Sequence, residues 1–419
     1  MGAFHTVHAS RKPTVHAMKF RLALLCLLSL CLLAPASPAQ VKLGIDVLRE
    51  SGYAALRGKR VGLITNQTGI DSRGVRTRQL LKQAPGVNLV ALFTPEHGLD
   101  GTELAGKYVA SRKDPVTGLI AHSLYGPTRK PTPQMLRGID VLVYDMQDIG
   151  VRSYTYVSTM GRCMEAAGEN GIAFVVLDRP NPLGGLRVEG PMIESRWISF
   201  VGQFPVPYVH GLTAGELARM SNAKGWMGAR CELTVIPMEG WSRGMAWPQT
   251  GLKWIRTSPN IPHGTSPLYY LATGIAGSLS GLELGIGGPE PFEVLAAPWI
   301  DPDRMLARFR GFRMDGVAFE PVRNYDGSAD GLRLRIDPHA PANLTGLAIH
   351  LLQEANRGAR PSLFARSKAD TLDIFYKVYG STSIRRQIEE GVPAEKIIAS
   401  WRPGVEAFRA ARQPFLLYR

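Results

Sequence analysis

Four short apolar runs in the first half of the chain each end in a cluster of polar residues. The runs cover residues 60–65, 88–93, 139–144 and 172–177, and they are rich in Val, Ile and Leu. Runs that are apolar throughout are typical of strands buried on both faces, as in a parallel sheet. We therefore predict that these runs are neighbouring strands of one parallel sheet.

Helical patterns lie between these runs. Apolar spacing and stop signals predict helices over residues 44–57, 77–84 and 155–169, the last one closed by Asn170-Gly171. Strands that alternate with helices form βαβ units, whose crossovers are right-handed. The first domain is therefore predicted to be α/β, with a Rossmann-like, doubly wound parallel sheet.

The pattern changes after residue 191, where Trp, Pro and Gly become frequent. Residues 317–322 and 332–336 read as strands, and helices dominate after Asn343. We predict a smaller α/β or α+β C-terminal domain, with residues 40–195 forming the first domain and residues 196–419 the second.

Three further segments have patterns of their own. Residues 98–136 are rich in Gly, Pro, Lys and Thr, which predicts an irregular loop that borders or covers a binding cleft. Residues 213–223 read as a helix capped by Thr213 and Glu216. The tail, residues 395–412, reads as an amphipathic packing helix.

The N-terminus has the pattern of a secretory signal peptide. Lys19 and Arg21 precede an apolar run over residues 22–33, which gives way to small residues ending near Ala39. The run is too short to span a membrane. We expect residues 1–39 to be removed, leaving an exported protein, periplasmic or extracellular, with no stable membrane insertion.

The chain is basic. Residues 1–39 hold four basic residues and no acid, so their removal lowers the net charge from +14 to +10. This charge suits an anionic polymer such as a cell-wall glycan, or serves solubility alone. The chain has no Lys/Arg block and no interleaved aromatic stripe, so we expect no nucleic-acid partner.

The four polar clusters are expected to line one cleft, because ligands bind outside the carboxyl ends of strands in such sheets. Glu96, between Pro95 and His97, is the strongest candidate for a general acid. A carboxyl at the mouth of an apolar sheet is partly desolvated, which favours the protonated form that an acid needs. The alternative role is a carboxylate that caps a helix or anchors a loop.

A second carboxyl is expected after the third run. We predict that one of Asp145 and Asp148 pairs with Arg152, and that the other lies opposite Glu96. Glu189 is a third acid that could reach the site. The predicted substrate-binding residues are polar side chains at or near the strand ends: Asn66, His97, Gln147, Arg152, Tyr154, Asp178, Arg179, Asn181, Glu189 and His210.

Other kinds of site are disfavoured. The histidines do not follow an HExxH or similar spacing, so no metal is expected. The chain has no GxSxG elbow, GxGxxG turn or P-loop, and we expect neither a serine hydrolase nor any cofactor. The spacing of Cys163 and Cys231 does not establish a disulfide.

A set of separate motifs, in order, resembles the exo-β-N-acetylmuramidase family. The motifs include Gly62-Leu-Ile-Thr-Asn-Gln-Thr-Gly69, Pro95-Glu-His-Gly98, Tyr154-Thr-Tyr156, Asp178-Arg-Pro-Asn-Pro-Leu-Gly-Gly185, Val188-Glu-Gly-Pro191, Ser258-Pro-Asn-Ile-Pro262 and Pro291-Phe-Glu293. The resemblance covers most of the chain after residue 39.

This resemblance implies a Rossmann-like domain and a smaller C-terminal domain with the active site in the crevice between them. It implies release of N-acetylmuramic acid from the non-reducing end of peptidoglycan fragments, with Glu96 as the leading catalytic residue. The lactyl carboxylate of that sugar would suit Arg152 or Arg179 as a partner.

One segment departs from the family pattern. Where many relatives carry Glu and Arg before the Pro-Phe-Glu motif, this chain has Leu284 and Ile286 within Gly281-Leu-Glu-Leu-Gly-Ile-Gly287. This departure leaves the exact sugar open. Two other functions stay open at this point: a non-catalytic peptidoglycan-binding protein, and a metal-dependent cell-wall hydrolase of another bond. The sequence does not indicate an oligomeric state.

Overall fold

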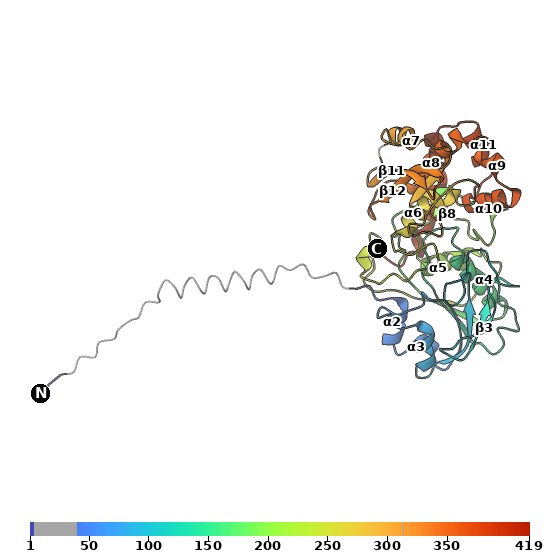
Figure 1. Ribbon diagram of the computed structural model, residues 1–419. Helices are drawn as coiled ribbons and strands as arrows, with labels where there is room; N and C mark the ends of the chain where they lie inside the picture. The colour runs from blue at the N-terminus through green and yellow to red at the C-terminus, as the bar shows by residue number, and fades with distance from the viewer. Residues whose placement is uncertain (4–39, 313) are drawn as a thin grey trace. The chain divides into compact units, whose positions relative to one another are not determined.

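The computed structural model describes residues 1–3, 40–312 and 314–419 (Figure 1). The predicted signal peptide therefore lies almost entirely outside the described residues. Residues 40–419 form one compact unit, and everything below concerns this unit.

The largest sheet has seven strands in the order β3-β4-β2-β1-β5-β6-β9. All neighbouring pairs are parallel except β3 with β4, which are antiparallel. The strands are β1 (Arg60–Thr65), β2 (Asn88–Thr94), β3 (Arg112–Lys113), β4 (Ile120–Ser123), β5 (Val141–Asp145), β6 (Ala173–Leu177) and β9 (Leu233–Ile236). The four predicted strands are confirmed as neighbours of one parallel sheet.

Helices cover both faces of this sheet, which explains the apolar runs. On one face, Leu63 and Val143 pack in a cluster with residues of α2 (Gly44–Glu50) and α3 (Thr77–Gln83). On the other face, Ile64 and Leu142 pack in a cluster with α4 (Thr155–Glu169). Successive strand residues point to opposite faces, so a strand covered on both sides needs an unbroken apolar run. Figure 1 shows α2 and α3 on one side of the sheet and α4 on the other.

Two parts of the sheet were not predicted from sequence. β3 and β4 lie inside residues 98–136, which were expected to be irregular, and β9 comes from residues placed in the second domain. β3 is exposed and β9 is only partly buried, so neither segment carries the apolar run of a central strand. Edge strands need only one paired side, and a short mixed sequence is sufficient for them.

The helix predictions hold with adjusted ends. The predicted helix over residues 44–57 is α2 followed by a separate 3₁₀ turn, η1 (Ala54–Leu56), because Gly52 and Tyr53 adopt left-handed backbone conformations. The predicted ends of α4 are confirmed. In α5 (Ala214–Lys224), the Thr213 side chain accepts from the Glu216 N–H and the Glu216 side chain accepts from the Thr213 N–H, as predicted.

The second half of the chain contains a three-stranded antiparallel sheet, order β10-β12-β11, and most of the remaining helices. Its strands are β10 (Val294–Ala297), β11 (Val317–Tyr325) and β12 (Ala329–Ile336), so both predicted strands are confirmed. The helices are α6 (Ser266–Thr273), α7 (Pro302–Phe309), α8 (Leu344–Gly358), α9 (Leu363–Arg366), α10 (Ala369–Tyr379), α11 (Ser383–Glu389), α12 (Ala394–Ser400) and α13 (Arg402–Arg412).

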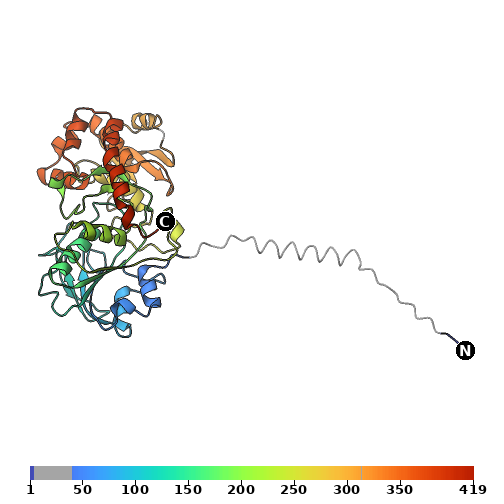
Figure 2. The same cartoon turned by 180° about the vertical axis from the view of Figure 1, so that it is seen from behind.

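The tail is two helices rather than the single helix predicted. α12 ends at Ser400 and α13 begins at Arg402, with Pro403 in its first turn. Proline lacks the N–H that would continue the preceding helix but fits a new first turn. Figure 2 shows α13 (red) running back toward the chain's C-terminus, and it packs against a small two-stranded sheet of β7 (Glu189–Met192) and β8 (Pro207–Val209).

The architecture is therefore a two-domain α/β protein. A mixed, mostly parallel seven-stranded sheet forms the first domain, and a smaller part with helices and an antiparallel sheet forms the second. Among the described residues, no helix combines the length and apolar character needed to cross a bilayer.

Candidate active site

The polar clusters meet at one edge of the large sheet. Adjacent strands place their carboxyl ends side by side, and Thr65 at the end of β1 pairs with Asp145 at the end of β5. Glu96 follows β2, and Asp178 follows β6, on either side of that pair. Neighbouring strands lie about 4.8 Å apart, so these residues are distributed along one edge.

Glu96 is held by one donor on each carboxylate oxygen. Its Oε1 accepts the backbone N–H of Gly106 at 2.7 Å, and its Oε2 accepts the Thr155 hydroxyl at 2.6 Å. The turn that carries it is tight, since both His97 and Gly98 have left-handed backbones. The loop that follows Glu96 therefore folds back over it, as the sequence predicts for a loop bordering a cleft.

Tyrosines surround this carboxylate. Burial, with the charge of Glu96 adding to it, raises the pKa of Tyr125 and also the pKa of Tyr156. The rings of Tyr154 and Tyr156 lie 4.8 Å apart in an edge-on arrangement. Pockets for organic ligands combine such apolar surfaces with a few fixed polar groups.

A segment from outside the sheet completes this wall. The Tyr154 hydroxyl donates to Thr257 Oγ1 at 2.9 Å, and the Tyr156 hydroxyl donates to the Thr257 carbonyl. Ser153 and Tyr270 of α6 share a hydrogen bond of 3.1 Å between their hydroxyls. The surroundings of Glu96 therefore include residues from the second half of the chain.

Asp148, unlike Glu96, has a carboxylate oxygen without a partner in the described part of this edge. Its Oδ2 accepts the Gly150 N–H at 2.7 Å, while Oδ1 is buried and has no hydrogen-bond partner among the described residues. Burial raises the pKa of Asp148 to about 7, although the N–H groups of Gly150 and Ile149 act against this. Asp148 can therefore exchange a proton near neutral pH.

The prediction that one of these acids pairs with Arg152 is wrong. Asp145 accepts from Arg179 Nε at 2.5 Å and from the Thr77 hydroxyl, and it is fully buried. Arg152 donates to four backbone carbonyls instead, those of Pro191, Val206, Val378 and Tyr379. Arg152 follows the third predicted strand closely in sequence, and Arg179 follows the fourth. Only tertiary packing decides which of the two contacts Asp145.

Asn66 and Gln147 belong to a second cluster at the same edge. Asn66 Oδ1 accepts the N–H and the hydroxyl of Thr68, and the Thr68 hydroxyl oxygen accepts the Gln147 N–H at 2.9 Å. Gln147 Nε2 donates to the carbonyls of Asp148 and Pro180. Asn66 Nδ2 and Gln147 Oε1 are buried without partners in the described part of the chain.

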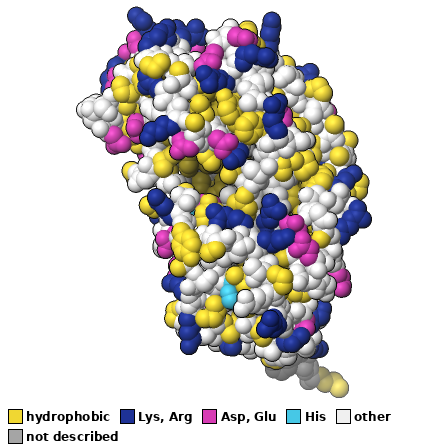
Figure 3. Space-filling model, turned by 90° about the vertical axis from the view of Figure 1, so that its right-hand side faces the viewer, with side chains coloured by type: hydrophobic (Ala, Val, Ile, Leu, Met, Phe, Trp, Pro, Cys, Tyr) yellow, Lys and Arg dark blue, Asp and Glu magenta, His cyan; other side chains and the backbone are white. Residues whose placement is uncertain are grey.

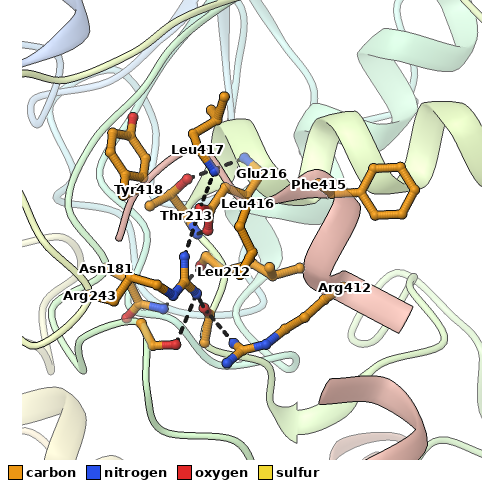
Figure 4. A network of polar contacts seen from close by, with 12 residues as sticks. Asn181, Leu212, Thr213, Glu216, Arg243, Arg412, Phe415, Leu416, Leu417 and Tyr418 are labelled. Atoms are coloured by element: carbon orange, nitrogen blue, oxygen red, sulfur yellow. Dashed lines mark hydrogen bonds and ion pairs between the residues drawn. The ribbon is translucent and has the colours of Figure 1, made fainter. Parts of the chain in front are cut away.

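The C-terminal tail braces the loop that follows β6 (Figure 4). Asp178 accepts from the Thr213 hydroxyl at 2.7 Å and from the Tyr418 hydroxyl at 2.6 Å. Burial raises the pKa of Asp178 to about 6, and these two bonds oppose that rise. Asn181 accepts from the Leu183 N–H and donates to the Leu212 carbonyl, which fixes the same loop.

An ion pair at the centre of Figure 4 joins three segments. Arg243 Nη1 lies 2.7 Å from Glu216 Oε1, which also accepts the N–H of Leu417. Arg412 of α13 donates to the carbonyls of His210 and Gly211. The C-terminal tail therefore helps to hold the segments that support the loop after β6.

Glu189 and His210 lie away from the contacts of Glu96. Glu189 pairs with Arg187 and accepts the Thr345 N–H, and it lines a different pocket together with Arg187. His210 is buried, and burial with the nearby Arg412 and Arg152 charges lowers its pKa to about 3. It therefore stays neutral at physiological pH. Their proposed contact with substrate stays a prediction.

The segment that departs from the family pattern splits between core and surface. Leu284 is buried in the main core, whereas Ile286 is about half exposed. Gly287 donates its N–H to Asn260 Oδ1 at 3.1 Å, which ties the segment to the Ser-Pro-Asn-Ile-Pro motif.

Three residues around Glu96 were missed at the sequence level: Gly106, Tyr125 and Thr155. Thr155 lies inside the Tyr154-Thr-Tyr156 motif, so the sequence motif could have identified it as a site residue. Gly106 contributes only its backbone N–H, which no residue pattern reveals. Residues 40–312 and 314–419 contain no group of three or more His, Cys, Asp or Glu placed to hold a metal ion, and Cys163 and Cys231 are both free thiols.

The surface view in Figure 3 shows the side of the molecule on which α4 and β3 lie in Figure 1. A hollow on this face is floored by hydrophobic side chains, with Lys, Arg, Asp and Glu side chains near it. Lys and Arg side chains are spread over the rest of this face, in keeping with the basic composition.

Two family models match the chain. Residues 61–265 match the model described as "Exo-beta-N-acetylmuramidase NamZ, N-terminal", and residues 268–418 match its C-terminal counterpart. A "Peptidoglycan beta-N-acetylmuramidase NamZ" from Bacillus subtilis is 37% identical over 390 residues, which are 91% of this chain and 92% of that protein.

Solved structures show the same relationship. A DUF1343 family protein from Bacteroides fragilis has a TM-score of 0.85 and 43% identity, covering 91% of this chain and 99% of the other. A second DUF1343 family protein from the same species has a TM-score of 0.69 and 28% identity, with the same coverage. Both domains and nearly the whole length after residue 39 are matched, and the chain belongs to the exo-β-N-acetylmuramidase NamZ family.

Proposed function

We propose that this glycoside hydrolase releases N-acetylmuramic acid from the non-reducing end of peptidoglycan fragments, with Glu96 as the general acid. Family membership supports the reaction, and the hydrogen bonds of Glu96 support its role. The observation that carries the assignment is that one of the two donors to Glu96 is a hydroxyl.

A hydroxyl can serve Glu96 in both protonation states. The Thr155 O–H donates to the carboxylate, and after rotation its oxygen accepts from the protonated acid. The Gly106 N–H keeps the other oxygen in place throughout. Glu96 can thus give its proton to the glycosidic oxygen and later regain one without losing its position.

Asp148 is the proposed second carboxyl. Its free oxygen, Oδ1, distinguishes it from Asp145, whose two oxygens are taken by Arg179 and Thr77. Burial raises the pKa of Tyr154, and the charges of Asp148 and Glu96 both add to that effect, which supports a shared site for the two carboxyls. The acetamido oxygen of the substrate is the alternative second group, as in other glycosidases that use substrate assistance.

The site is proposed to occupy the crevice between a Rossmann-like, doubly wound sheet and the C-terminal domain. The order β4-β2-β1-β5-β6-β9 supports this, because it has the 3-2-1-4-5-6 pattern of dinucleotide-binding sheets. The bond between Ser153 and Tyr270 beside Tyr154 also supports it, because Tyr270 belongs to the part matched by the second family model.

Export is part of the proposal. The basic residues, apolar run and small residues at the N-terminus support an exported enzyme that works on peptidoglycan in the periplasm or outside the cell. No cofactor is needed for the proposed chemistry.

The test is hydrolysis of a chromogenic β-N-acetylmuramide by the wild type and by Glu96→Gln. The amide keeps the size of the side chain and an acceptor for Gly106, but it cannot donate an acidic proton. General acid–base catalysis contributes about 10²–10⁴-fold, so we expect a loss of at least about 100-fold with an unchanged melting temperature. Unchanged turnover would remove Glu96 from the mechanism.

The same assay separates the two competing functions. A non-catalytic peptidoglycan-binding protein would bind glycan fragments and release no chromophore in the wild type. A metal-dependent hydrolase would lose its activity with EDTA and regain it with added metal. Either result would replace the proposed function.

A further inference from the structure

A small pocket opens at the same edge of the sheet as Glu96. It lies beside the ends of β5 and β6, whereas Glu96 follows β2. It has a volume of about 110 Å³, and Ile70, Gln147, Arg179, Leu252 and Lys253 are among its lining residues. None of the residues that hydrogen-bond to Glu96 line it. Its lining comes from the start of α2, the loop before α3, the strand ends of β5 and β6, and residues 247–255.

Gln147 lines this pocket, and its amide oxygen has no partner in the part of the chain that the structure describes. Its Nε2 is fixed by the carbonyls of Asp148 at 2.8 Å and Pro180 at 2.7 Å, which sets the orientation of the amide. Oε1 is left buried with no partner among the described residues, and Gln147 is 3% exposed. A buried acceptor without a donor is costly, so a bound ligand that donates a hydrogen bond is favoured here.

Arg179 also lines the pocket, and one of its guanidinium nitrogens has no hydrogen bond among the described residues. Its Nε bonds to Asp145 at 2.5 Å and its Nη2 to the Ile70 carbonyl at 2.6 Å. No hydrogen bond of Nη1 is found within residues 40–312 and 314–419. A guanidinium held rigidly on two sides, with a third group free, is well placed to bind a carboxylate.

The charge of the lining favours an anion. Lys253 adds a further positive charge to that of Arg179, whereas Arg73 is paired with Asp71, the acid in the lining. Asp71 is neutralised locally, because it pairs with Arg49 and Arg73 and accepts the Val75 N–H.

The volume limits what can enter. An apolar cavity of about 150 Å³ accommodates benzene, so a pocket of about 110 Å³ accepts a group of a few heavy atoms and excludes a pyranose ring. The side chains of Leu43, Ile70 and Leu252 provide an apolar wall that suits a methyl group. A three-carbon carboxylate with one methyl branch matches the size, the charge and this wall.

We propose that this pocket binds the lactyl carboxylate of the terminal N-acetylmuramic acid residue, with Arg179 and Lys253 facing the carboxylate and Gln147 Oε1 accepting an N–H or O–H of the same sugar. The inference rests on the proposed function. Arg152 is unsuited to this role because its guanidinium already serves four carbonyls. The strands that lead to Glu96 and Gln147 are two positions apart, or about 10 Å at the usual spacing, which a pyranose with its lactyl arm can span.

The test measures binding to the full chain carrying Glu96→Gln, so that it does not depend on turnover. Isothermal titration calorimetry compares N-acetylmuramic acid with N-acetylglucosamine, which is the same sugar without the lactyl group. We expect tighter binding of N-acetylmuramic acid. Adding Lys253→Ala should weaken it about threefold to fivefold, the effect of one exposed charge pair, and should leave N-acetylglucosamine unaffected.

Two further variants make the result specific. Gln147→Glu keeps the side-chain size and places a negative charge against the carboxylate, so it should weaken N-acetylmuramic acid binding by at least about tenfold. Lys82→Ala is the matched control, because Lys82 is an exposed lysine of α3 that does not line the pocket. Equal affinity for the two sugars, or an equal loss in Lys82→Ala and Lys253→Ala, would overturn the proposal.

D-lactate distinguishes the two sources of the same chemical group. If D-lactate competes with N-acetylmuramic acid, the pocket serves the lactyl arm of the substrate. If D-lactate binds without displacing the sugar, the pocket is a separate site for a free hydroxy acid and the proposal fails. Failure of the wild type to hydrolyse a muramide would refute the proposed function, while the binding preference is measured independently.

Discussion

Arg152 has a structural role in the fold, where the sequence predicts a substrate-binding one. The family resemblance predicts Arg152, four residues after Asp148, as a substrate-binding cation, whereas its guanidinium donates to four carbonyls in the structure. The distances are 2.8 Å to Pro191, 2.8 Å to Val206, 3.2 Å to Val378 and 2.8 Å to Tyr379. Two of these carbonyls belong to the end of α10, so Arg152 ties the second domain to the first.

The expected cost of Arg152→Met follows from these bonds. Each contributes about 1 kcal/mol net, so their loss should lower the free energy of unfolding by about 4 kcal/mol. The unfolding entropy is about 2.1 cal/mol/K per residue, or about 0.8 kcal/mol/K for the unit formed by residues 40–419. The melting temperature should therefore fall by about 5 °C.

Scanning calorimetry of the chain from residue 40 to residue 419 measures this change, and muramide kinetics on the same samples measure KM. Arg162→Met is the matched control, because Arg162 also lies on this part of the chain but makes only a partly exposed ion pair with Glu165. Such pairs contribute about 0–1 kcal/mol, so its melting temperature should change by about 1 °C or less. An unchanged melting temperature in Arg152→Met together with a raised KM would refute the structural role and restore the sequence-based one.

Two further predictions concern the carboxyls of the site. Thr155→Val removes the hydroxyl that bonds to Glu96 and should lower kcat by at least about tenfold, which is the cost of one hydrogen bond to a charged group. Thr155→Ser keeps the hydroxyl and should keep most of kcat in the muramide assay. Equal kcat values for the Val and Ser variants would contradict the role of the hydroxyl. Because burial raises the pKa of Asp148 from its ordinary value near 3.8 to about 7, the folded state binds the proton more tightly, and the stability of the wild type should fall as pH rises from about 4 to about 7. Asp148→Asn abolishes this dependence, so urea unfolding should show a gain over the wild type of up to about 4 kcal/mol at pH 8 and a much smaller one at pH 5; a gain that is independent of pH would contradict it.

The central sheet was predictable because the burial of each strand determines the residues of that strand itself. Each central strand is buried on both faces, so strands such as β1 and β5 need apolar residues along nearly their whole length. The capping box of α5 is equally local, since Thr213 and Glu216 satisfy each other within one turn. The edge strands β3 and β9 were missed because pairing on one side places little demand on composition.

The candidate site was predictable only in part. The position of Glu96 at the end of a buried strand follows from the run before it, and family motifs point to the same residue. The partners of each polar group do not follow, because they come from segments far apart in the chain: Thr155 for Glu96, Tyr418 for Asp178 and Arg179 for Asp145.

The sequence by itself established the α/β class, the buried parallel strands and the row of polar residues at their ends, because these depend on periodicity and on burial that each strand carries with it. The tertiary structure was needed to separate two arginines that look alike in sequence. Four carbonyls take both terminal nitrogens of the buried Arg152 guanidinium, whereas Arg179 keeps one terminal nitrogen without a hydrogen bond among the described residues and lines a small pocket. The reason is physical: a side chain's hydrogen bonds are shared among whichever groups packing brings near it, and packing joins residues that the sequence keeps far apart.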